Sequence, residues 1–202
     1  MAQDRTAEIV AFDFDGTLTV EDSFTAFLKW RAGPWRYGLG CVRLIPAGVA
    51  YLFHRDRGRI KAAAVAVFLK GARRRDLEVE AQRFADLAWD RFMRPDALAA
   101  WMRWRRDGAR LVIVTASPDL TVGPFARRLG ADDLLGTVLA FDGEDRVTGA
   151  FAEPNCRGPE KVARLTEAFG PGLKLRAAYG DTGGDTEMLA LAQEAGFRVF
   201  RG

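Results

Sequence analysis

The stretch that decides the fold reads Ile9-Val10-Ala11-Phe12-Asp13-Phe14-Asp15-Gly16-Thr17-Leu18-Thr19. Residues 9–14 are short and largely apolar and run into a glycine-containing turn, a pattern typical of a buried strand. Ligands of open parallel sheets bind at the carboxyl ends of the strands, which is where Asp13 and Asp15 stand. Alternate strand residues point to the same side, so both carboxylates could face one site.

The second half of the chain alternates strand-like and helix-like segments. This order predicts an α/β fold with a doubly wound, Rossmann-like parallel sheet and helices on both faces. We expect strands at 111–114, 175–179 and 197–200, helices at 118–130, 158–169 and 184–195, and a hairpin formed by 137–141 and 146–151 around the turn at 142–145.

A block of helical patterns interrupts this alternation after the first strand. The simplest architecture is a core domain of residues 1–20 and 105–202 with a helical insertion at 21–104. Within the insertion we expect helices at 36–53, kinked or broken at Pro46, at 59–69, at 76–93 with Asp76 as N-cap, and at 96–106.

Composition narrows the possible chemistry. The chain has 202 residues, 49% hydrophobic and 28% charged, which suits a core domain with a smaller insertion rather than a disordered chain. Two distant cysteines, Cys41 and Cys156, argue against a disulfide scaffold and suit a reducing compartment. The single histidine, His54, disfavours Ser-His-Asp or Cys-His catalysis unless it takes part itself. Catalysis should therefore rest on carboxylates, lysine and metal.

Three further motifs follow predicted strands or open predicted helices. Thr115-Ala116-Ser117 ends a strand and could cradle an anion with hydroxyl and N–H groups, although Ser or Thr capping a helix is the plainer interpretation. Lys161 lies in the first turn of a helix, where the helix dipole disfavours a cation unless an anion lies nearby. Taken alone, Lys161 is more simply interpreted as a solvated surface lysine. Asp181 and Asp185 follow another strand within a glycine-rich loop.

Oxygen ligands converge in this arrangement. The carboxylates of Asp13 and Asp181 with the Asp15 carbonyl would suit Mg²⁺ that retains several waters. Each motif alone is weak evidence, since Asp and Gly are common in turns that end strands. Their combination and order are far more specific.

Taken together, these motifs resemble the haloacid dehalogenase superfamily over essentially the whole chain. The resemblance implies a phosphatase in which Asp13 is the nucleophile and Asp15 the general acid and base. It further implies that Thr115, with Ala116 and Ser117 beside it, binds phosphate, and that Lys161 binds phosphate and orients the nucleophile. Asp13, Asp15, Asp181 and Asp185 would form the metal site for Mg²⁺. An Asp at position 15 points to phosphatases rather than dehalogenases.

The insertion resembles the cap of the phosphoserine phosphatase-like branch, subfamily IB. Asp22-Ser23-Phe24 with Phe27-Leu28, the apolar-basic stretch around Pro46, and 156–163 look more closely like the phosphatidylglycerophosphatase C family. The loop at 180–185 is a departure in a motif that varies among these enzymes. The resemblance implies a lipid phosphate as substrate. A phosphatase for a soluble metabolite such as phosphoserine is the alternative.

Charge is distributed unevenly along the chain. Between Lys29 and Arg75 twelve Lys or Arg residues accompany one acid, Asp56, a net charge of +11; since the whole chain carries +3, the remainder carries −8. A basic segment of this kind favours an anionic partner. A nucleic-acid binder is a remote alternative, because no nucleic-acid motif is present and the four acidic motif positions would stay unexplained.

The segment 38–53 is the part of the chain that we expect to contact a membrane. As a helix it would span roughly 24 Å, short of a ~30 Å hydrocarbon core, and no run of 18 apolar residues occurs, so we expect a helix lying in an anionic membrane surface. The basic residues that flank it are Arg36, Arg55, Arg57, Arg59 and Lys61, and the candidate interfacial aromatic residues are Trp30, Trp35, Tyr37 and Tyr51. The plainer alternative is a helix that packs its apolar face on the core. No secretory signal is evident, so the expected place is the cytoplasm, peripherally at the inner face of its membrane.

Overall fold

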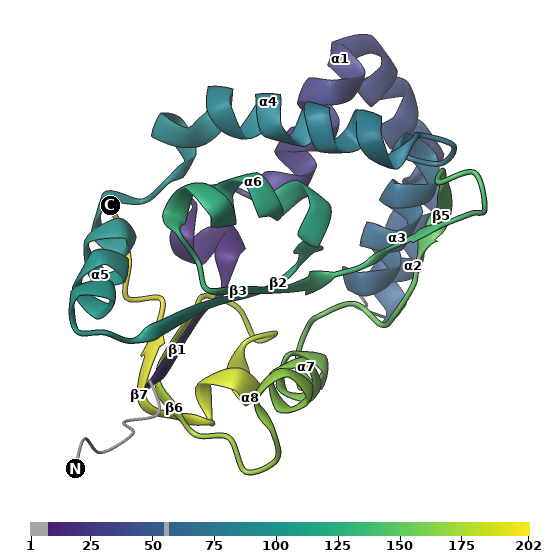
Figure 1. Cartoon of the computed structure of the whole chain (residues 1–202). Coiled ribbons are helices and arrows are strands. Elements are labelled where there is room, and N and C mark those ends of the chain that lie inside the picture. Colours follow the sequence, from purple (N-terminus) through teal and green to yellow (C-terminus); the bar gives the residue numbers. More distant parts are fainter. Residues whose placement is uncertain (1–7, 55–56) are drawn as a thin grey trace, which may run out of the picture.

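Parallel strands form the central sheet of the molecule (Figure 1). The computed structural model describes residues 8–54 and 57–202, without the side chains of residues 50–57. In spatial order the strands are β3 (Asp133–Thr137), β2 (Arg110–Pro118), β1 (Ile9–Phe12), β6 (Leu175–Gly180) and β7 (Ala192–Phe197), each parallel to its neighbour. The predicted α/β fold with a Rossmann-like parallel sheet is thereby confirmed.

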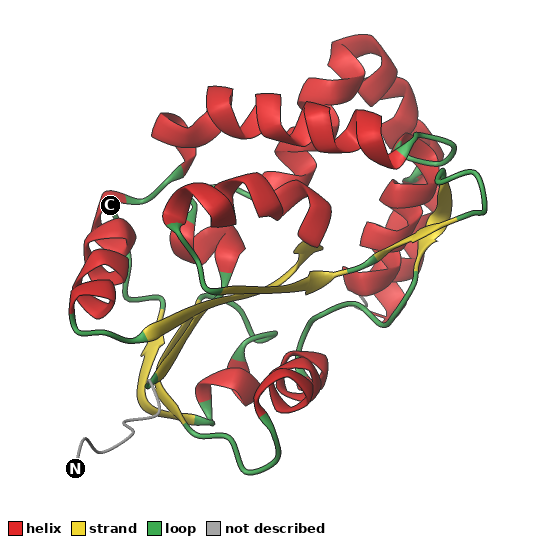
Figure 2. Ribbon diagram, viewed as in Figure 1, coloured by secondary structure: helices red, strands yellow, loops and turns green. Residues whose placement is uncertain are grey.

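Helices cover both faces of this sheet (Figure 2). Successive residues of β1 show why, because their side chains enter different hydrophobic clusters: Phe12 packs with Trp101 and Phe125, whereas Ala11 packs with Leu165 and Met188. The helices that supply these partners are α5 (Pro95–Arg106) and α6 (Asp119–Leu129) on one face, and α7 (Pro159–Phe169) and α8 (Thr186–Leu189) on the other.

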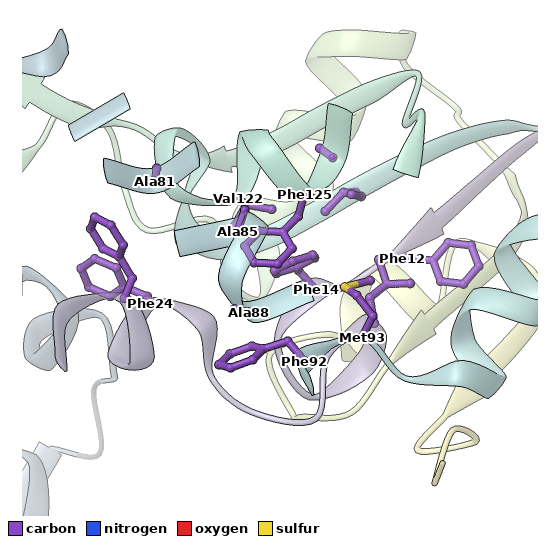
Figure 3. Close-up of a cluster of buried hydrophobic side chains, with 14 of the residues drawn as sticks. Phe12, Phe14, Phe24, Ala81, Ala85, Ala88, Phe92, Met93, Val122 and Phe125 are labelled. Atoms are coloured by element: carbon purple, nitrogen blue, oxygen red, sulfur yellow. The ribbon is translucent and has the colours of Figure 1, made fainter. Parts of the chain in front are cut away.

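The segment between β1 and β2 begins with a π-type turn, η1 (Phe14–Leu18), and continues into helices. Four helices follow before α5: α1 (Ser23–Arg43), α2 (Ile45–His54), α3 (Arg57–Phe68) and α4 (Arg74–Phe92). Figure 3 shows Ala85 and Ala88 of α4 beside Phe125 of α6 and Phe14. The insertion therefore shares the larger hydrophobic cluster of the core instead of forming one of its own.

The division of the chain at residues 20 and 105 stays a prediction. Most of α5 falls on the insertion side of that division, yet α5 packs on the sheet. The ring centroid of Trp101 lies 5.0 Å from that of Phe12 on β1, and the Trp101 indole N–H donates to Leu129 O at 3.1 Å. We use the name cap below for α1 to α4, residues 23–92.

Residues 38–53 belong to two helices. Helix α1 ends at Arg43 and α2 begins at Ile45, so the break lies just before Pro46, which sits in the first turn of α2 where its missing N–H is tolerated. The predicted interruption at Pro46 is confirmed. A second break was not predicted: Gly33 has a φ of +71°, a conformation that favours glycine, and Pro34 follows it.

The C-terminal elements correct the sequence-based prediction. A helix at 184–195 and a strand at 197–200 were expected, but α8 is one turn long and 192–197 form the edge strand β7. Ala192-Gln193-Glu194-Ala195 has good helix formers, and pairing with β6, in which Ala192 aligns with Leu175, overrides that preference.

Smaller corrections concern boundaries. Thr137 ends the unpredicted strand β3, and the hairpin consists of β4 (Leu139–Phe141) and β5 (Val147–Phe151). Helix α4 begins at Arg74 after Arg73, so Asp76 is not its N-cap. Asp76 lies in the first turn, where the helix dipole favours a carboxylate just as well.

Candidate active site

Asp13 and Lys161 meet at the carboxyl end of the sheet. Asp13 follows β1 directly, and its backbone N–H donates to Tyr179 O on β6 at 2.9 Å. Lys161, in the first turn of α7, is buried, and its Nζ donates to Asp13 Oδ1 at 2.6 Å, Val114 O at 2.6 Å and Asp185 Oδ1 at 2.7 Å. The structure thus turns a lysine that could have been a surface residue into the cation between two buried carboxylates.

For Asp13, Asp185 and Lys161, burial and the neighbouring charges shift the pKa in opposite directions. Burial raises the pKa of Asp13 to about 7, although the ammonium of Lys161 pulls it down. Burial would raise the pKa of Asp185 as well, but Lys161 and the Thr182 donors hold it below its usual value. Burial alone would lower the pKa of Lys161, and the two carboxylates raise it instead. Lys161 therefore stays charged, and of its two carboxylate partners Asp185 is stabilised as an anion whereas Asp13 is not.

Asp15 points toward the cap. Its Oδ1 accepts hydrogen bonds from Ser23 N at 2.7 Å and from Ser23 Oγ at 2.5 Å, and its Oδ2 accepts a short one from Ser117 Oγ. Burial and the nearby Asp22 carboxylate raise the pKa of Asp15, against the effects of Lys61, Ser117 and Ser23. A raised pKa suits a carboxyl group that must hold and release a proton near neutral pH.

The loop after β6 brings Asp181 and Asp185 to the same place. Asp185 Oδ2 accepts from Thr182 N at 2.9 Å, Thr182 Oγ1 at 3.0 Å and Asp181 N at 3.2 Å, so this carboxylate is held firmly. Asp181 Oδ1 is buried and has no hydrogen-bond partner among the residues that the structure describes. Gly16, with a φ of +82°, lets the Asp181 carboxylate approach, because a Cβ there would lie 2.3 Å from Asp181 Oδ2.

These carboxylates fit a hard divalent cation. Asp13, Asp181 and Asp185 each offer an oxygen, and these atoms lie within 4.8 Å of one another. The orphaned Asp181 Oδ1 is the kind of buried polar atom that a bound ion would satisfy. The side chain of Asp15 lies outside this cluster, which leaves its backbone carbonyl as the group that it could offer.

The motif Thr115-Ala116-Ser117 ends β2 beside the site. Ala116 lines the catalytic pocket, whereas Thr115 is fully buried and its Oγ1 accepts from Ser117 N at 3.1 Å. Ser117 Oγ bonds to Asp15 and accepts from Lys61 Nζ at 3.1 Å. In this structure the two hydroxyls organise the strand end and Asp15, and Ala116 faces the pocket.

Sequence reasoning missed several polar residues of the pocket, which encloses about 120 Å³. Lys61 from α3 and Asp22 before α1 lie on its cap side, 3.6 Å apart from Nζ to Oδ2. Arg157, whose Nη1 donates to Thr182 Oγ1 at 3.3 Å, lines it from the core with Asn155. Arg157 could have been suspected from its place four residues before Lys161, but no local pattern could show that Lys61 reaches a site that begins 48 residues earlier.

Known proteins resemble the chain along most of its length. A family model described as haloacid dehalogenase-like hydrolase matches residues 10–190. Protein CicA of Caulobacter vibrioides is 60% identical over 194 residues, which is 96% of this chain and 87% of CicA.

Solved structures share the fold. A protein with unknown function from Bordetella pertussis Tohama I has a TM-score of 0.76 at 21% identity, covering 94% of this chain and 89% of that one. A phospho-aspartyl intermediate analogue of phosphoserine phosphatase has a TM-score of 0.61 at 19% identity, covering 95% and 86%. The family match, together with the fold and with the carboxylates gathered at the sheet end, shows that the chain belongs to the haloacid dehalogenase-like hydrolase family.

Proposed function

We propose that the chain is a Mg²⁺-dependent phosphomonoester hydrolase that works through an aspartyl-phosphate intermediate. The observation that carries the proposal is the buried Asp13 carboxylate, in contact with Lys161 and next to the separately held Asp15 carboxyl group. Such a pair offers a nucleophile and a proton donor in one pocket. The family to which the chain belongs and its fold likeness to phosphoserine phosphatases support the same conclusion.

The proposed reaction has two steps. In the first, a carboxylate oxygen of Asp13 bonds to phosphorus, the ester P–O bond breaks, and the leaving oxygen takes the proton of Asp15. In the second, Asp15 takes a proton from water as the water oxygen bonds to phosphorus, and the bond to Asp13 breaks to release phosphate. Lys161 holds Asp13 in place and offsets negative charge on the phosphoryl group.

Asp13, Asp181 and the Asp15 carbonyl would hold Mg²⁺, and Asp185 would support the site through Lys161 and Thr182. When bound, such an ion supplies positive charge that lets a dianionic phosphate approach several carboxylates. Removing it with EDTA should therefore abolish turnover, and adding Mg²⁺ back should restore it.

The finer proposal is that the substrate is a lipid phosphate such as phosphatidylglycerophosphate. Apolar side chains stand in solvent along the cap, with Trp35 90% and Val42 60% exposed, followed by Leu39, Ile45 and Val49. Together with the basic character of the cap, this supports peripheral binding at an anionic membrane surface on the cytoplasmic side. Arg55 lies outside the described residues, as do the side chains of Tyr51 and Arg57. Among the described residues, no helix is both long and apolar enough to cross a membrane.

A second candidate is a phosphatase for a soluble metabolite such as phosphoserine. The pocket itself is small and polar, and Asp22 and Lys61 offer opposite charges at its cap side, as a zwitterionic leaving group would need. A nucleic-acid binder explains neither the buried carboxylates nor Lys161, and no observation favours it.

A substrate panel with Mg²⁺ tests these proposals together. It compares p-nitrophenyl phosphate, phosphoserine, sugar phosphates, lysophosphatidic acid, phosphatidic acid and phosphatidylglycerophosphate. Turnover of p-nitrophenyl phosphate that requires Mg²⁺ is expected first, and its absence would overturn the phosphatase proposal. A preference for phosphatidylglycerophosphate over the other substrates is expected next. A preference for phosphoserine would instead identify the protein as a phosphatase for a soluble metabolite.

Co-sedimentation with phosphatidylglycerol vesicles tests the membrane partner. The double variant Leu39→Glu/Val42→Glu should weaken binding at least about tenfold, since burial of even part of two apolar side chains exceeds 1.4 kcal/mol. Val79→Glu, at an exposed apolar position of α4, is the matched control. Raising the salt from 0.1 to 1 M should weaken binding without ending it, because screening removes the charge attraction alone.

A further inference from the structure

We propose that an apolar groove between α1 and α4 receives the hydrocarbon chain of the leaving group. This inference rests on the proposed phosphatase function and concerns the part of the substrate beyond its phosphoryl group. The groove encloses about 720 Å³ within the size range of small-molecule sites, and its floor and walls include Ala26, Trp30, Tyr37, Phe84, Ala88 and Phe92.

The groove and the catalytic pocket have one lining residue in common, Asp22. Glu21 and Thr25 continue the groove from there along the first turns of α1. The catalytic pocket encloses about 120 Å³ and the groove about 720 Å³. The leaving group of a larger phosphomonoester therefore finds more room in the groove than in the pocket.

Aromatic rings make the groove suitable for hydrocarbon. Trp30 lies with its ring centroid 5.7 Å from that of Phe84 and 6.1 Å from that of Phe27, so its position is fixed although it is 39% exposed. Leu87 on the opposite helix is 73% exposed. Covering such surface with an alkyl chain removes apolar area from water on both sides of the contact.

The two ends of the groove indicate a chain rather than a compact apolar group. At one end Asp22 leads to the phosphoryl site, and at the other the groove reaches Gly33 and Pro34, where α1 breaks. Beyond that break the same helix carries the exposed Trp35 and Leu39. A hydrocarbon chain that follows α1 would therefore pass from the reacting phosphate to the apolar surface proposed to meet the membrane.

The charged groups at the rim do not oppose this occupant. Arg91 is paired with Glu21 at 2.8 Å, and Lys29 lines the edge. A docked protein helix would need polar partners along a longer face, and it would not account for the lining residue that the groove shares with the catalytic pocket. The occupant is thus an alkyl or acyl chain covalently attached to the phosphate being cleaved.

Turnover of a series of alkyl phosphates tests this inference. n-Butyl, n-hexyl and n-octyl phosphate are compared below their micelle concentrations, with p-nitrophenyl phosphate as the reference for the phosphoryl site. Complete burial of a methylene is worth up to about fourfold in kcat/KM, so partial burial in the groove should give at least about tenfold from butyl to octyl. A flat profile with normal p-nitrophenyl phosphate turnover would overturn the groove and leave the phosphatase standing. Loss of all turnover would overturn both.

Two variants locate the effect in the groove. Leu87→Asp places a charge on its wall and should flatten the chain-length profile while p-nitrophenyl phosphate turnover stays unchanged. Val79→Asp, on the same helix but not among the residues that line the groove, should keep the profile. Thr25→Trp fills the groove without adding a charge and should act like Leu87→Asp. Thermal unfolding confirms that each variant is folded, and an unchanged profile in both groove variants would contradict the proposal.

Discussion

The core end of the catalytic site buries its charged side chains, whereas the cap leaves charged and apolar side chains in contact with solvent. In the core, Asp13, Lys161 and Asp185 are buried, and Lys161 contacts both carboxylates at 2.6 and 2.7 Å. In the cap, the pair of Arg31 and Glu80 is partly exposed, and large apolar side chains such as Trp35 stand in solvent. Charge held in a buried, fixed geometry is what a reaction at phosphorus needs, whereas a surface that chooses a leaving group can remain open and apolar.

This contrast predicts that a core carboxylate and a cap carboxylate differ most in their effect on activity. Asp13→Asn should lower turnover of p-nitrophenyl phosphate at least about 10³-fold, because an amide is a poor nucleophile. Asp90→Asn, at an exposed position of α4, should leave activity within twofold. Phosphate trapped by rapid quench on a residue other than Asp13 would contradict the mechanism.

Replacing a carboxylate on either side of the catalytic pocket should also have different effects, depending on the leaving group of the substrate. Asp15→Asn should slow alkyl phosphates about 10²- to 10⁴-fold and aryl phosphates much less, because an aryloxide departs without a proton. Asp22→Asn, across the pocket in contact with Lys61, should cost about tenfold or less on either class. Steady-state rates on paired aryl and alkyl phosphates measure this, and equal losses for Asp15→Asn would count against its acid role.

Loss of a cationic side chain should likewise lower the free energy of unfolding more in the core than in the cap. Lys161→Met leaves two buried carboxylates without their partner and should lower the free energy of unfolding by about 3–5 kcal/mol. Arg31→Met removes a partly exposed pair in the cap and should cost about 1 kcal/mol or less. Urea unfolding of the two variants compares them, and equal losses would mean that burial does not distinguish the regions.

A smaller effect, confined to the core, is expected in the dependence of protein stability on pH. The pKa of Asp13 is raised from 3.8 to about 7 on folding, so the metal-free folded protein binds this proton more tightly than the unfolded chain does. The stability that the proton contributes is present in acid and is lost as the pH rises through 7. Between pH 5.5 and 8 the loss should be about 2 kcal/mol by linkage.

Thermal unfolding in EDTA at the two pH values measures this loss. Asp13→Asn, which has no proton to lose there, should show correspondingly less dependence on pH. A wild-type protein that gains stability from Asp13 on going to pH 8 would reverse the sign and contradict the assignment.

The smallest expected difference concerns the two thiols. Burial raises the pKa of Cys156 to about 11, and its Sγ lies 3.6 Å from Leu135 O inside the core. Cys41 is exposed on α1 of the cap. Iodoacetamide at pH 8 should therefore label Cys41 and leave Cys156 unmodified until the protein is denatured, as peptide mass spectrometry can establish. Labelling of both under native conditions would show that the core opens readily.

The sequence by itself determined the three inner strands of the sheet, the order of the chemical motifs and the position of Asp13. A short apolar strand that ends in Asp-x-Asp-Gly places its carboxylates at the carboxyl end of a sheet, and the other motifs in their order make that end specific. It also determined that Lys161 opens a helix. These features depend on residues within one turn or one strand of each other, which is the range over which propensity and periodicity act.

Tertiary structure alone decided which groups meet. Lys61 reaches Ser117 across 56 positions of the chain, and Lys161 reaches Asp13 across 148. The edge strand β7 formed because β6 offered a partner to residues that would otherwise favour a helix. Contacts of this kind depend on the packing of whole elements. The sequence pattern therefore identified Asp13 as the proposed nucleophile, whereas the fold supplied the cation beside it and the shape of its pocket.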